Sequence, residues 1–188
     1  RQHPITALMP ASTANTVHGN YGDAWVRDNV YTVQAIWGLA LAWRRQGQRP
    51  ARVYALEQSV LALMRGLMRS MMAQAAKVER FKASQELLDA LHAKYDTETG
   101  QPVVADNAWG HLQLDATSLF VLQLAQLTRS GLVVVANGAQ AAFVQNLIYY
   151  LCRAYRVADY GIWERGDKGN NGAPERNASS IGLVKAAL

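Results

Sequence analysis

The sequence predicts an all-α fold, and two observations support that prediction. Apolar residues recur at intervals of three and four along four long segments and one shorter one, whereas the alternation typical of strands is almost absent. Hydrophobic residues make up 50% of the 188 positions, so the chain can bury one sizeable core. We therefore expect a single all-α domain.

The expected helices begin and end at recognisable signals. Gly47 and Pro50 mark the end of the first helix, Gly131 ends the third, and Asn177 or Ser179 is placed to cap the fifth. The second helix carries a methionine-rich apolar stripe, which is typical of a buried face although it superficially resembles a calmodulin target. The helices are expected over residues 28–45, 52–75, 115–129 and 140–156, and from about 177 onward.

Two connections are unusually long, over residues 77–114 and 158–176. Compact domains mostly use loops of a few residues, and long ordered loops often carry function. If successive helices run antiparallel, the segments before the first, third and fifth helices all emerge at one end of the domain. We expect a functional site at that end.

Each of these three segments combines a tryptophan with a carboxylate. Sugar rings present an apolar face for aromatic stacking and a rim of hydroxyls for carboxylates or arginine, so this combination favours a carbohydrate site. The helix starts add unpaired N–H donors, and His111 is expected to donate a hydrogen bond. The three combinations are Trp25 with Asp28, Trp109 with Asp115, and Trp163 with Glu164.

A structural interpretation stays open for any one of these segments. Asp28 can act as a favourable charge at a helix start, Arg27 as its ion-pair partner, and Trp25 as a side chain that packs against the helix. Trp37 and Trp43 lie inside the first helix and are expected in the core.

Other classes of function find little support. The formal charge of +5 comes from scattered lysines and arginines, so we expect no nucleic-acid partner. No zinc-like spacing, phosphate loop or nucleophile motif is present, and we expect no metal and no cofactor. The single cysteine, Cys152, is expected to be buried. Apolar runs are shorter than the roughly 20 residues of a transmembrane segment and no secretory signal is visible, so we expect a cytoplasmic protein.

Several longer runs resemble the α and β regulatory subunits of phosphorylase kinase. The N-terminal domain of that family resembles in turn the glucoamylases of glycoside hydrolase family 15, which fold as an α/α toroid of six inner and six outer helices. The resemblance implies that residues 1–188 form about half of such a toroid, without its first helix and its C-terminal half. The runs include residues 24–31 (AWVRDNVY), 54–60 (YALEQSV), 109–118 (WGHLQLDATS) and 161–168 (GIWERGDK).

The resemblance also implies a pocket for the non-reducing end of an α-1,4-glucan or maltooligosaccharide. By it, Arg27 and Asp28 hold the hydroxyls of the terminal glucose, and Glu164 is the general acid of an inverting hydrolysis. The second carboxylate of such a hydrolysis would come from beyond Leu188. The remaining substrate-binding residues are expected to be Trp25, Trp109, His111, Gln113, Asp115, Trp163 and Arg165.

One position departs from the glucoamylase pattern, because Arg165 follows Glu164 where those enzymes tend to carry a second acid. A guanidinium favours the ionised carboxylate, whereas a general acid needs its proton, although Asp167 can pair with Arg165 and reduce the effect. Two functions therefore stay open. One is a glucan-binding domain that hydrolyses terminal glucose. The alternative is a non-catalytic regulatory or scaffold domain in glycogen metabolism, with kinase or calmodulin-type partners. A purely structural helical array would need no convergent tryptophan and acid pairs.

Overall fold

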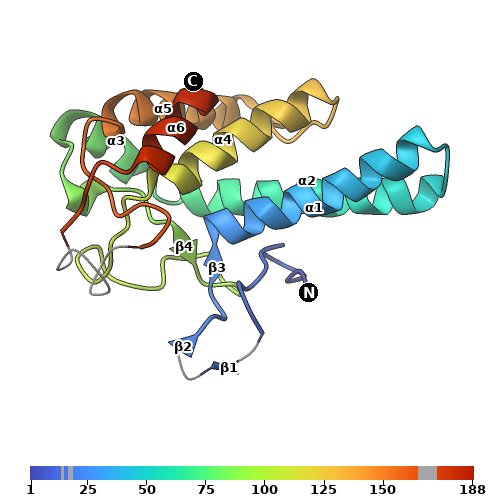
Figure 1. Ribbon diagram of the computed structural model, residues 1–188, viewed down its shortest axis with the longest axis horizontal. Coiled ribbons are helices and arrows are strands. Elements are labelled where there is room, and N and C mark those ends of the chain that lie inside the picture. The colour runs from blue at the N-terminus through green and yellow to red at the C-terminus, as the bar shows by residue number, and fades with distance from the viewer. Residues whose placement is uncertain (14, 17–18, 165–172) are drawn as a thin grey trace.

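Figure 1 shows a computed structural model of the protein, which describes all residues except 14, 17–18 and 165–172. It confirms the all-α class, since the strands in the described part have only two residues each. The helices are α1 Val26–Arg45, α2 Pro50–Met72, α3 Ala75–Ser84, α4 Leu114–Arg129, α5 Gly138–Ala154 and α6 Ala178–Ala187, with a short 3-10 turn η1 at Leu87–Asp89. The strands are β1 Asn15–Thr16, β2 Gly19–Asn20, β3 Ala24–Trp25 and β4 Lys94–Tyr95; β1 pairs with β2 and β3 with β4, both antiparallel.

The helices form two layers. Helix α4 packs against α1 on one side and α6 on the other, so these three helices lie side by side in the first layer (Figure 1). Helix α2 returns antiparallel to α1, and α5 contacts α2, α3 and α4 to form the second layer. Paired helices in two layers are the arrangement expected for part of an α/α toroid.

The core lies between the layers and confirms that the second helix has a buried face. The methionine stripe of α2 is fully buried at Met64, Met68 and Met71, beside Leu63 and Leu67. Unbranched methionine side chains fill irregular gaps between helices, so this face is occupied by the protein's own core. The stripe is therefore not an exposed calmodulin target.

The structure corrects the second expected helix, which ends at Met72 and is followed by a separate helix. Gln74 leaves the helical conformation, with φ −107° and ψ 21°, and α3 starts after it. Val78 and Phe81 are buried, and α3 packs against α5. Most other positions of α3 are polar or small, so its periodicity is too weak to distinguish it from the long loop that we expected.

The expected cap of the fifth helix is confirmed in position only. Asn177, one of the two candidates, occupies the N-cap position of α6, but its side chain makes no capping hydrogen bond. Its amide Nδ2 donates to the Asp159 carboxylate at 2.8 Å instead. Ser179 lies inside the helix.

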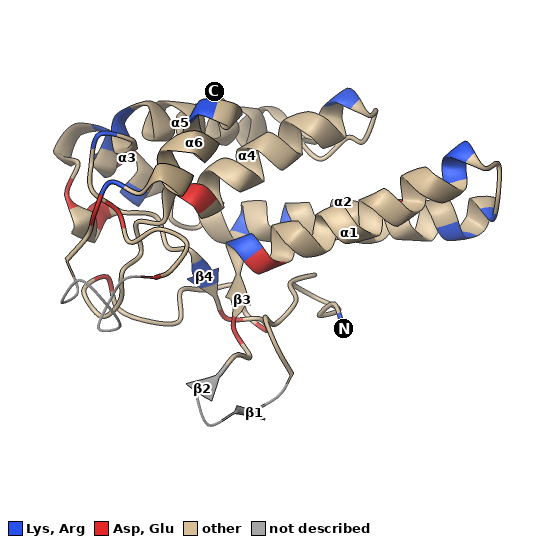
Figure 2. Ribbon diagram, viewed as in Figure 1, with Lys and Arg blue, Asp and Glu red and all other residues tan. Residues whose placement is uncertain are grey.

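The far end of the α1–α2 hairpin, which we call the hairpin tip (residues 43–57), is exposed and basic. Gly47 has φ +64°, and Arg49 is left-handed before Pro50 at the helix start. Trp43 is half-buried beneath the Arg49 guanidinium rather than in the core, with 5.3 Å from Cζ to the ring centroid. Figure 2 shows the arginines around this tip.

Two further expectations concern the helix surfaces. Cys152 is exposed on α5, which corrects the expectation that it is buried. Trp37 is partly buried and packs against the core. In the part of the chain that the structure describes, no helix has both the length and the apolar character needed to cross a membrane.

Candidate functional site

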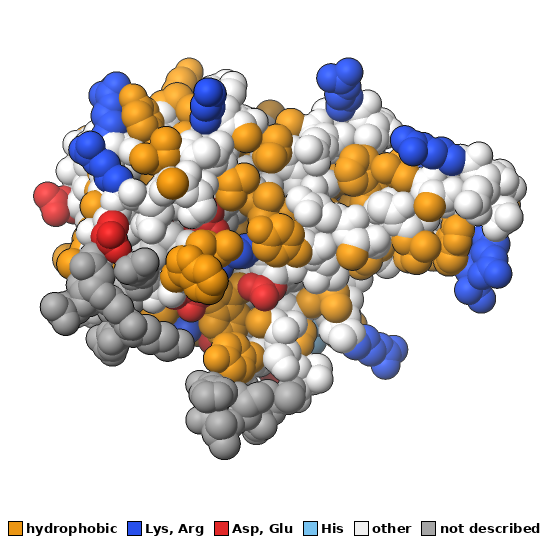
Figure 3. Space-filling view, viewed as in Figure 1, with side chains coloured by type: hydrophobic (Ala, Val, Ile, Leu, Met, Phe, Trp, Pro, Cys, Tyr) orange, Lys and Arg blue, Asp and Glu red, His pale blue; other side chains and the backbone are white. Residues whose placement is uncertain are grey.

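The structure brings the three tryptophan and carboxylate segments together at one end of the domain, which we call the loop-rich end. Arg27 in the first turn of α1 contacts Asp115 in the first turn of α4. Trp25, in β3 just before α1, contacts Glu164 in the segment that precedes α6. In the space-filling view, hydrophobic and acidic side chains lie next to each other around this region (Figure 3).

Arg27 is the centre of a buried polar cluster. Its Nε donates to Asp115 Oδ2 at 2.5 Å and its Nη2 donates to Gln113 Oε1 at 3.0 Å. Gln113 in turn donates from Nε2 to the Gly110 carbonyl oxygen at 3.0 Å. Burial alone would lower the pKa of Arg27, but the hydrogen bond and charge of Asp115, with the charge of Glu164, raise it. Arg27 is therefore a permanent cation that ties α1 to α4.

Glu164 lies against Trp25 and Arg27. Its Oε1 accepts a hydrogen bond from Trp25 Nε1 at 2.6 Å and is 3.9 Å from Arg27 Nη1. Glu164 has a left-handed backbone, with φ +49°, an uncommon conformation for a residue with a side chain. Its amide donates to the Gly161 carbonyl oxygen at 3.1 Å and closes a tight turn. The turn presents the carboxylate to the indole N–H.

Lys94 lies between Trp25 and Trp109, two of the three tryptophans of the site. The antiparallel pairing of β3 with β4 sets Trp25 opposite Lys94. The Lys94 ammonium is 5.0 Å from the Trp25 ring centroid and 4.5 Å from that of Trp109, and it is 3.8 Å from Asp23 Oδ2. A cation over an aromatic face is attracted by the ring's negative potential. Trp25, Lys94 and Trp109 therefore form a continuous wall.

A buried pair of histidines supports Trp109 from behind. The rings of His92 and His111 stack with centroids 3.4 Å apart, and Trp109 meets His111 edge-on at 5.5 Å. His111 Nε2 lies 2.9 Å from the Ala105 carbonyl oxygen, so this nitrogen carries the proton. Burial lowers the pKa of His111 to about 4. His111 is buried and its Nε2 is already bonded, and its contacts with His92 and Trp109 support the wall.

His92 belongs to an ionic network that continues behind this stack. Its Nε2 lies 2.7 Å from Asp106 Oδ1, and Asp106 also pairs with the Lys77 ammonium on α3. Burial lowers the pKa of His92, against the opposite effect of its bond to Asp106. The network anchors the long connection between α3 and α4.

Asp159 joins three segments that are distant in sequence. Its carboxylate accepts from the Leu114 amide at the start of α4 at 3.1 Å, from Asn177 Nδ2 at 2.8 Å and from Ser180 Oγ at 2.6 Å. Asp159 is only 1% exposed, so these bonds replace its hydration. We call this group the Asp159 hub; it fixes the start of α4 relative to α6.

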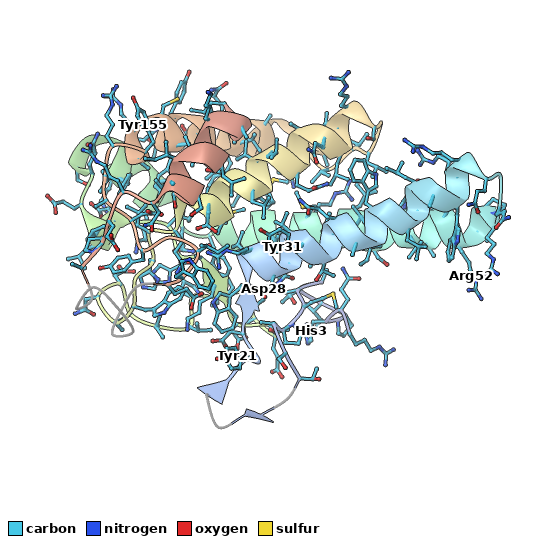
Figure 4. All side chains as sticks on the ribbon, in the orientation of Figure 1. His3, Tyr21, Asp28, Tyr31, Arg52 and Tyr155 are labelled. Carbon is cyan, nitrogen blue, oxygen red and sulfur yellow. The ribbon has the colours of Figure 1, made fainter. Side chains whose placement is uncertain are left out.

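Two expected site residues are exposed. Asp28 lies on the outer face of the first turn of α1, close to Tyr31 (Figure 4). Trp163 is 76% exposed. Both side chains are accessible to a ligand without any rearrangement. Arg165, an expected site residue, and Asp167, its possible ion-pair partner, lie outside the described residues.

The arrangement supplies aromatic faces, fixed hydrogen-bond donors and carboxylates, which is what a sugar requires. Among the described residues, no group of three or more His, Cys, Asp or Glu side chains could hold a metal ion.

Sequence reasoning missed Lys94, the His92–Asp106 network and the Asp159 hub. The place of Lys94 depends on the pairing of β3 with β4, which two-residue strands do not reveal. Asp159 stands four residues before Trp163 at the start of a long connection, and that proximity was the only signal.

A helical double layer with tryptophans, arginine and carboxylates gathered at one end is the scaffold of an all-α glycosidase-type domain. The chain belongs to glycosyl hydrolases family 15, whose sequence profile matches residues 1–188.

The curated relatives are regulatory proteins. The chain is 56% identical over 190 residues to phosphorylase b kinase regulatory subunit alpha, liver isoform, of Takifugu rubripes. It is 54% identical to the probable phosphorylase b kinase regulatory subunit alpha of Drosophila melanogaster and 48% identical to that of Caenorhabditis elegans. These alignments cover 100% of this chain and 15% of each relative, so the chain spans about 15% of their length.

Proposed function

We propose that this domain binds the non-reducing end of an α-1,4-glucan within a regulatory subunit and does not cleave it. The observation that carries the proposal is the environment of Glu164. Its carboxylate accepts the Trp25 N–H at 2.6 Å and lies 3.9 Å from the Arg27 guanidinium. Both neighbours favour an ionised carboxylate, whereas a general acid must hold a proton. Glu164 suits a hydrogen-bond acceptor better than a proton donor.

The names of the relatives support the regulatory part of the proposal, since each is a regulatory subunit alpha of phosphorylase b kinase. We infer that the complete gene product works beside a kinase, in the cytoplasm. A calmodulin-type partner stays a prediction from the family resemblance.

The proposed site has an exposed rim and a mostly buried wall. Asp28 and Trp163 form the rim that meets the hydroxyls and the apolar face of a glucose ring, and Trp25, Lys94 and Trp109 form the wall, in which Trp25 is only 8% exposed and the Lys94 ammonium lies over both rings. The wall is held in place from below by Arg27, Gln113 and Asp115. Because these three side chains are buried and bonded to one another, we assign them a positioning role.

Binding is tested by titrating maltoheptaose into the complete gene product and its variants in a calorimeter. We expect Trp163→Ala to weaken binding about tenfold, the loss expected when one aromatic stacking contact is removed. Asp28→Asn should weaken it less. Tyr54→Ala is the matched control, since Tyr54 is also an exposed aromatic, 63% exposed, but lies at the hairpin tip. Equal binding by all three variants, or none by the wild type, would contradict a glucan site here.

Cleavage is tested separately by measuring glucose release from maltoheptaose, with Glu164→Gln alongside the wild type. We expect no release from either protein, while binding persists. Release that Glu164→Gln abolishes would instead establish an inverting hydrolase with Glu164 as its acid, the other function that the sequence left open.

A further inference from the structure

A shallow basic groove lies on the second layer, at the end of α5 beside α3. Its volume is about 440 Å³, and it is lined by Lys82, Tyr149, Cys152, Arg153 and Arg156. None of these residues belongs to the candidate carbohydrate site. Figure 2 shows basic positions on both helices here, and Tyr155, next to the groove, is labelled in Figure 4.

The groove has an excess of positive charge. Lys82 is neutralised in part, since its ammonium is 2.9 Å from Glu79 Oε2 and donates to Asn146 Oδ1 at 2.9 Å. Within the described ranges, neither Arg153 nor Arg156 has a carboxylate within 4.0 Å. A further cation is close by, because Arg176 donates from Nη2 to the Arg156 carbonyl oxygen at 3.1 Å. The groove can therefore accept anionic groups without first breaking an ion pair of these two arginines.

Two exposed tyrosines flank these cations. Tyr149 is 53% exposed and Tyr155 is 36% exposed. The Lys82 ammonium lies 5.9 Å from the Tyr149 ring centroid, and Arg156 lies over Tyr155 at 5.2 Å while donating to its hydroxyl at 3.0 Å. Tyrosine and arginine are enriched at protein interfaces, where they bury a large area at low entropic cost.

A simpler explanation covers only part of this cluster. Arg153 lies in the last turn of α5 and Arg156 two residues past its end, where cations are favourable because of the helix dipole. That effect does not account for Lys82 on α3, for Arg176 from another segment, or for the exposed Tyr149 ring in the groove and the exposed Tyr155 ring beside it. At the hairpin tip, by contrast, Arg44 pairs with Glu57 on the facing helix.

We propose that this groove docks an acidic segment of a partner protein. Carboxylates of that segment pair with Arg153 and Arg156, and its apolar side chains pack on Tyr149 and Tyr155. A small anion would use the two cations but leave the tyrosines uncovered. A protein segment uses both, and it suits a domain whose relatives are named as subunits.

The test measures binding of a short fluorescein-labelled peptide of alternating glutamate and leucine to the complete gene product, by fluorescence anisotropy. We expect the double variant Arg153→Glu with Arg156→Glu to bind about tenfold more weakly, from two lost surface ion pairs. The matched control reverses Arg45 and Arg52, two exposed arginines of the α1–α2 hairpin, and makes the same change in net charge. The control should bind like the wild type, and a peptide with glutamine in place of glutamate should not bind.

Cys152 supplies a second measurement, because it lines the groove and is exposed. Its alkylation by iodoacetamide, followed by mass spectrometry, should be fast in the free protein and slowed by the acidic peptide. Slow alkylation without peptide would mean that another part of the gene product already covers the groove, which overturns the proposal. The proposal is also overturned if both arginine double variants lose peptide binding equally. It is overturned too if tripolyphosphate displaces the peptide completely and the peptide leaves the rate of Cys152 alkylation unchanged.

Discussion

The loop-rich end and the hairpin tip both carry an ion pair between two neighbouring helices, but the two pairs differ in their surroundings. At the loop-rich end, the side chains of Arg27 and Asp115 are 10% and 1% exposed. At the tip, those of Arg44 and Glu57 are 47% and 15% exposed. The same type of ion pair is therefore buried between helices at one end and partly exposed to water at the other. The comparison shows that burial decides what a charged residue does in this fold.

The largest expected difference comes from removing the arginine of each pair. Arg27→Met leaves the buried Asp115 carboxylate without its cation, and we expect the free energy of unfolding to fall by about 3–5 kcal/mol. Arg44→Met should lower it by less than about 1 kcal/mol, because Arg44 is 47% exposed and its pair with Glu57 lies at the surface. Urea unfolding of both variants measures the difference. Similar losses at the two ends would remove the distinction drawn here.

A second difference concerns pH, because the loop-rich end holds a buried histidine stack and the tip, residues 43–57, contains no histidine. The pKa of His111 is lowered from 6.5 to about 4, so between these values the unfolded chain binds more protons than the folded one. The contribution of His111 to the free energy of unfolding is therefore fully present above about pH 6.5. It is lost as the pH falls toward 4, by roughly 3 kcal/mol at about 1.4 kcal/mol per pH unit.

The matched variant for that measurement is His111→Phe, which keeps a ring in the stack but cannot take up a proton. Urea midpoints measured across the same pH range should vary less in the variant than in the wild type. The two curves would run parallel if His111 had no part in the dependence.

Glycine substitutions sharpen the comparison at the level of packing. A β-carbon on Gly110 would lie 2.3 Å from Cγ of Tyr160, so Gly110→Ala should destabilise the protein by about 1–3 kcal/mol. Gly38 lies within α1, where an added β-carbon would meet nothing within 4 Å, and Gly38→Ala should stabilise the protein by about 0.5–1 kcal/mol. Thermal unfolding gives the two signs, and a loss at Gly38 would contradict the packing described.

The smallest expected difference is in the stability lost when each of two cations over tryptophan rings is removed. Lys94→Met removes the ammonium between Trp25 and Trp109 and should cost about 1–2 kcal/mol, because the contact is largely shielded from water. Arg49→Met removes an exposed contact over Trp43 and should cost less than about 1 kcal/mol. Unfolding followed by tryptophan fluorescence measures both, and equal values would show that shielding contributes little.

The fold could be predicted where periodicity is strong. The first, third and fourth helices lie within two residues of their expected bounds, because long amphipathic stripes face the core. Helix α3 could not be found, since few of its residues are buried and its contacts come from α5. Trp43 and Cys152 were expected to be buried because each is an apolar residue type within a helical pattern, which does not reveal that they lie at a tip and on an outer face.

The site could be predicted in outline but not in its contacts. Antiparallel helices bring Trp25, Asp115 and Glu164 to one end, and that much follows from chain order. The burial of His111 does not follow, because it depends on the path of the connection between α3 and α4. The place of Lys94 in the wall does not follow from chain order either, because it depends on a strand pairing of only two residues.

The wide spacing of the site's partners along the chain has a consequence for how the protein folds. Arg27 and Asp115 are 88 positions apart, and Trp25 and Glu164 are 139 apart, whereas Arg44 and Glu57 are only 13 apart. Closing longer loops costs more chain entropy, and distant contacts form more slowly. The α1–α2 hairpin can therefore assemble early, while the contacts of Arg27 with Asp115 and of Trp25 with Glu164 close later. Changes at these two contacts should therefore mainly raise the rate of unfolding, whereas changes at the hairpin tip should mainly slow folding.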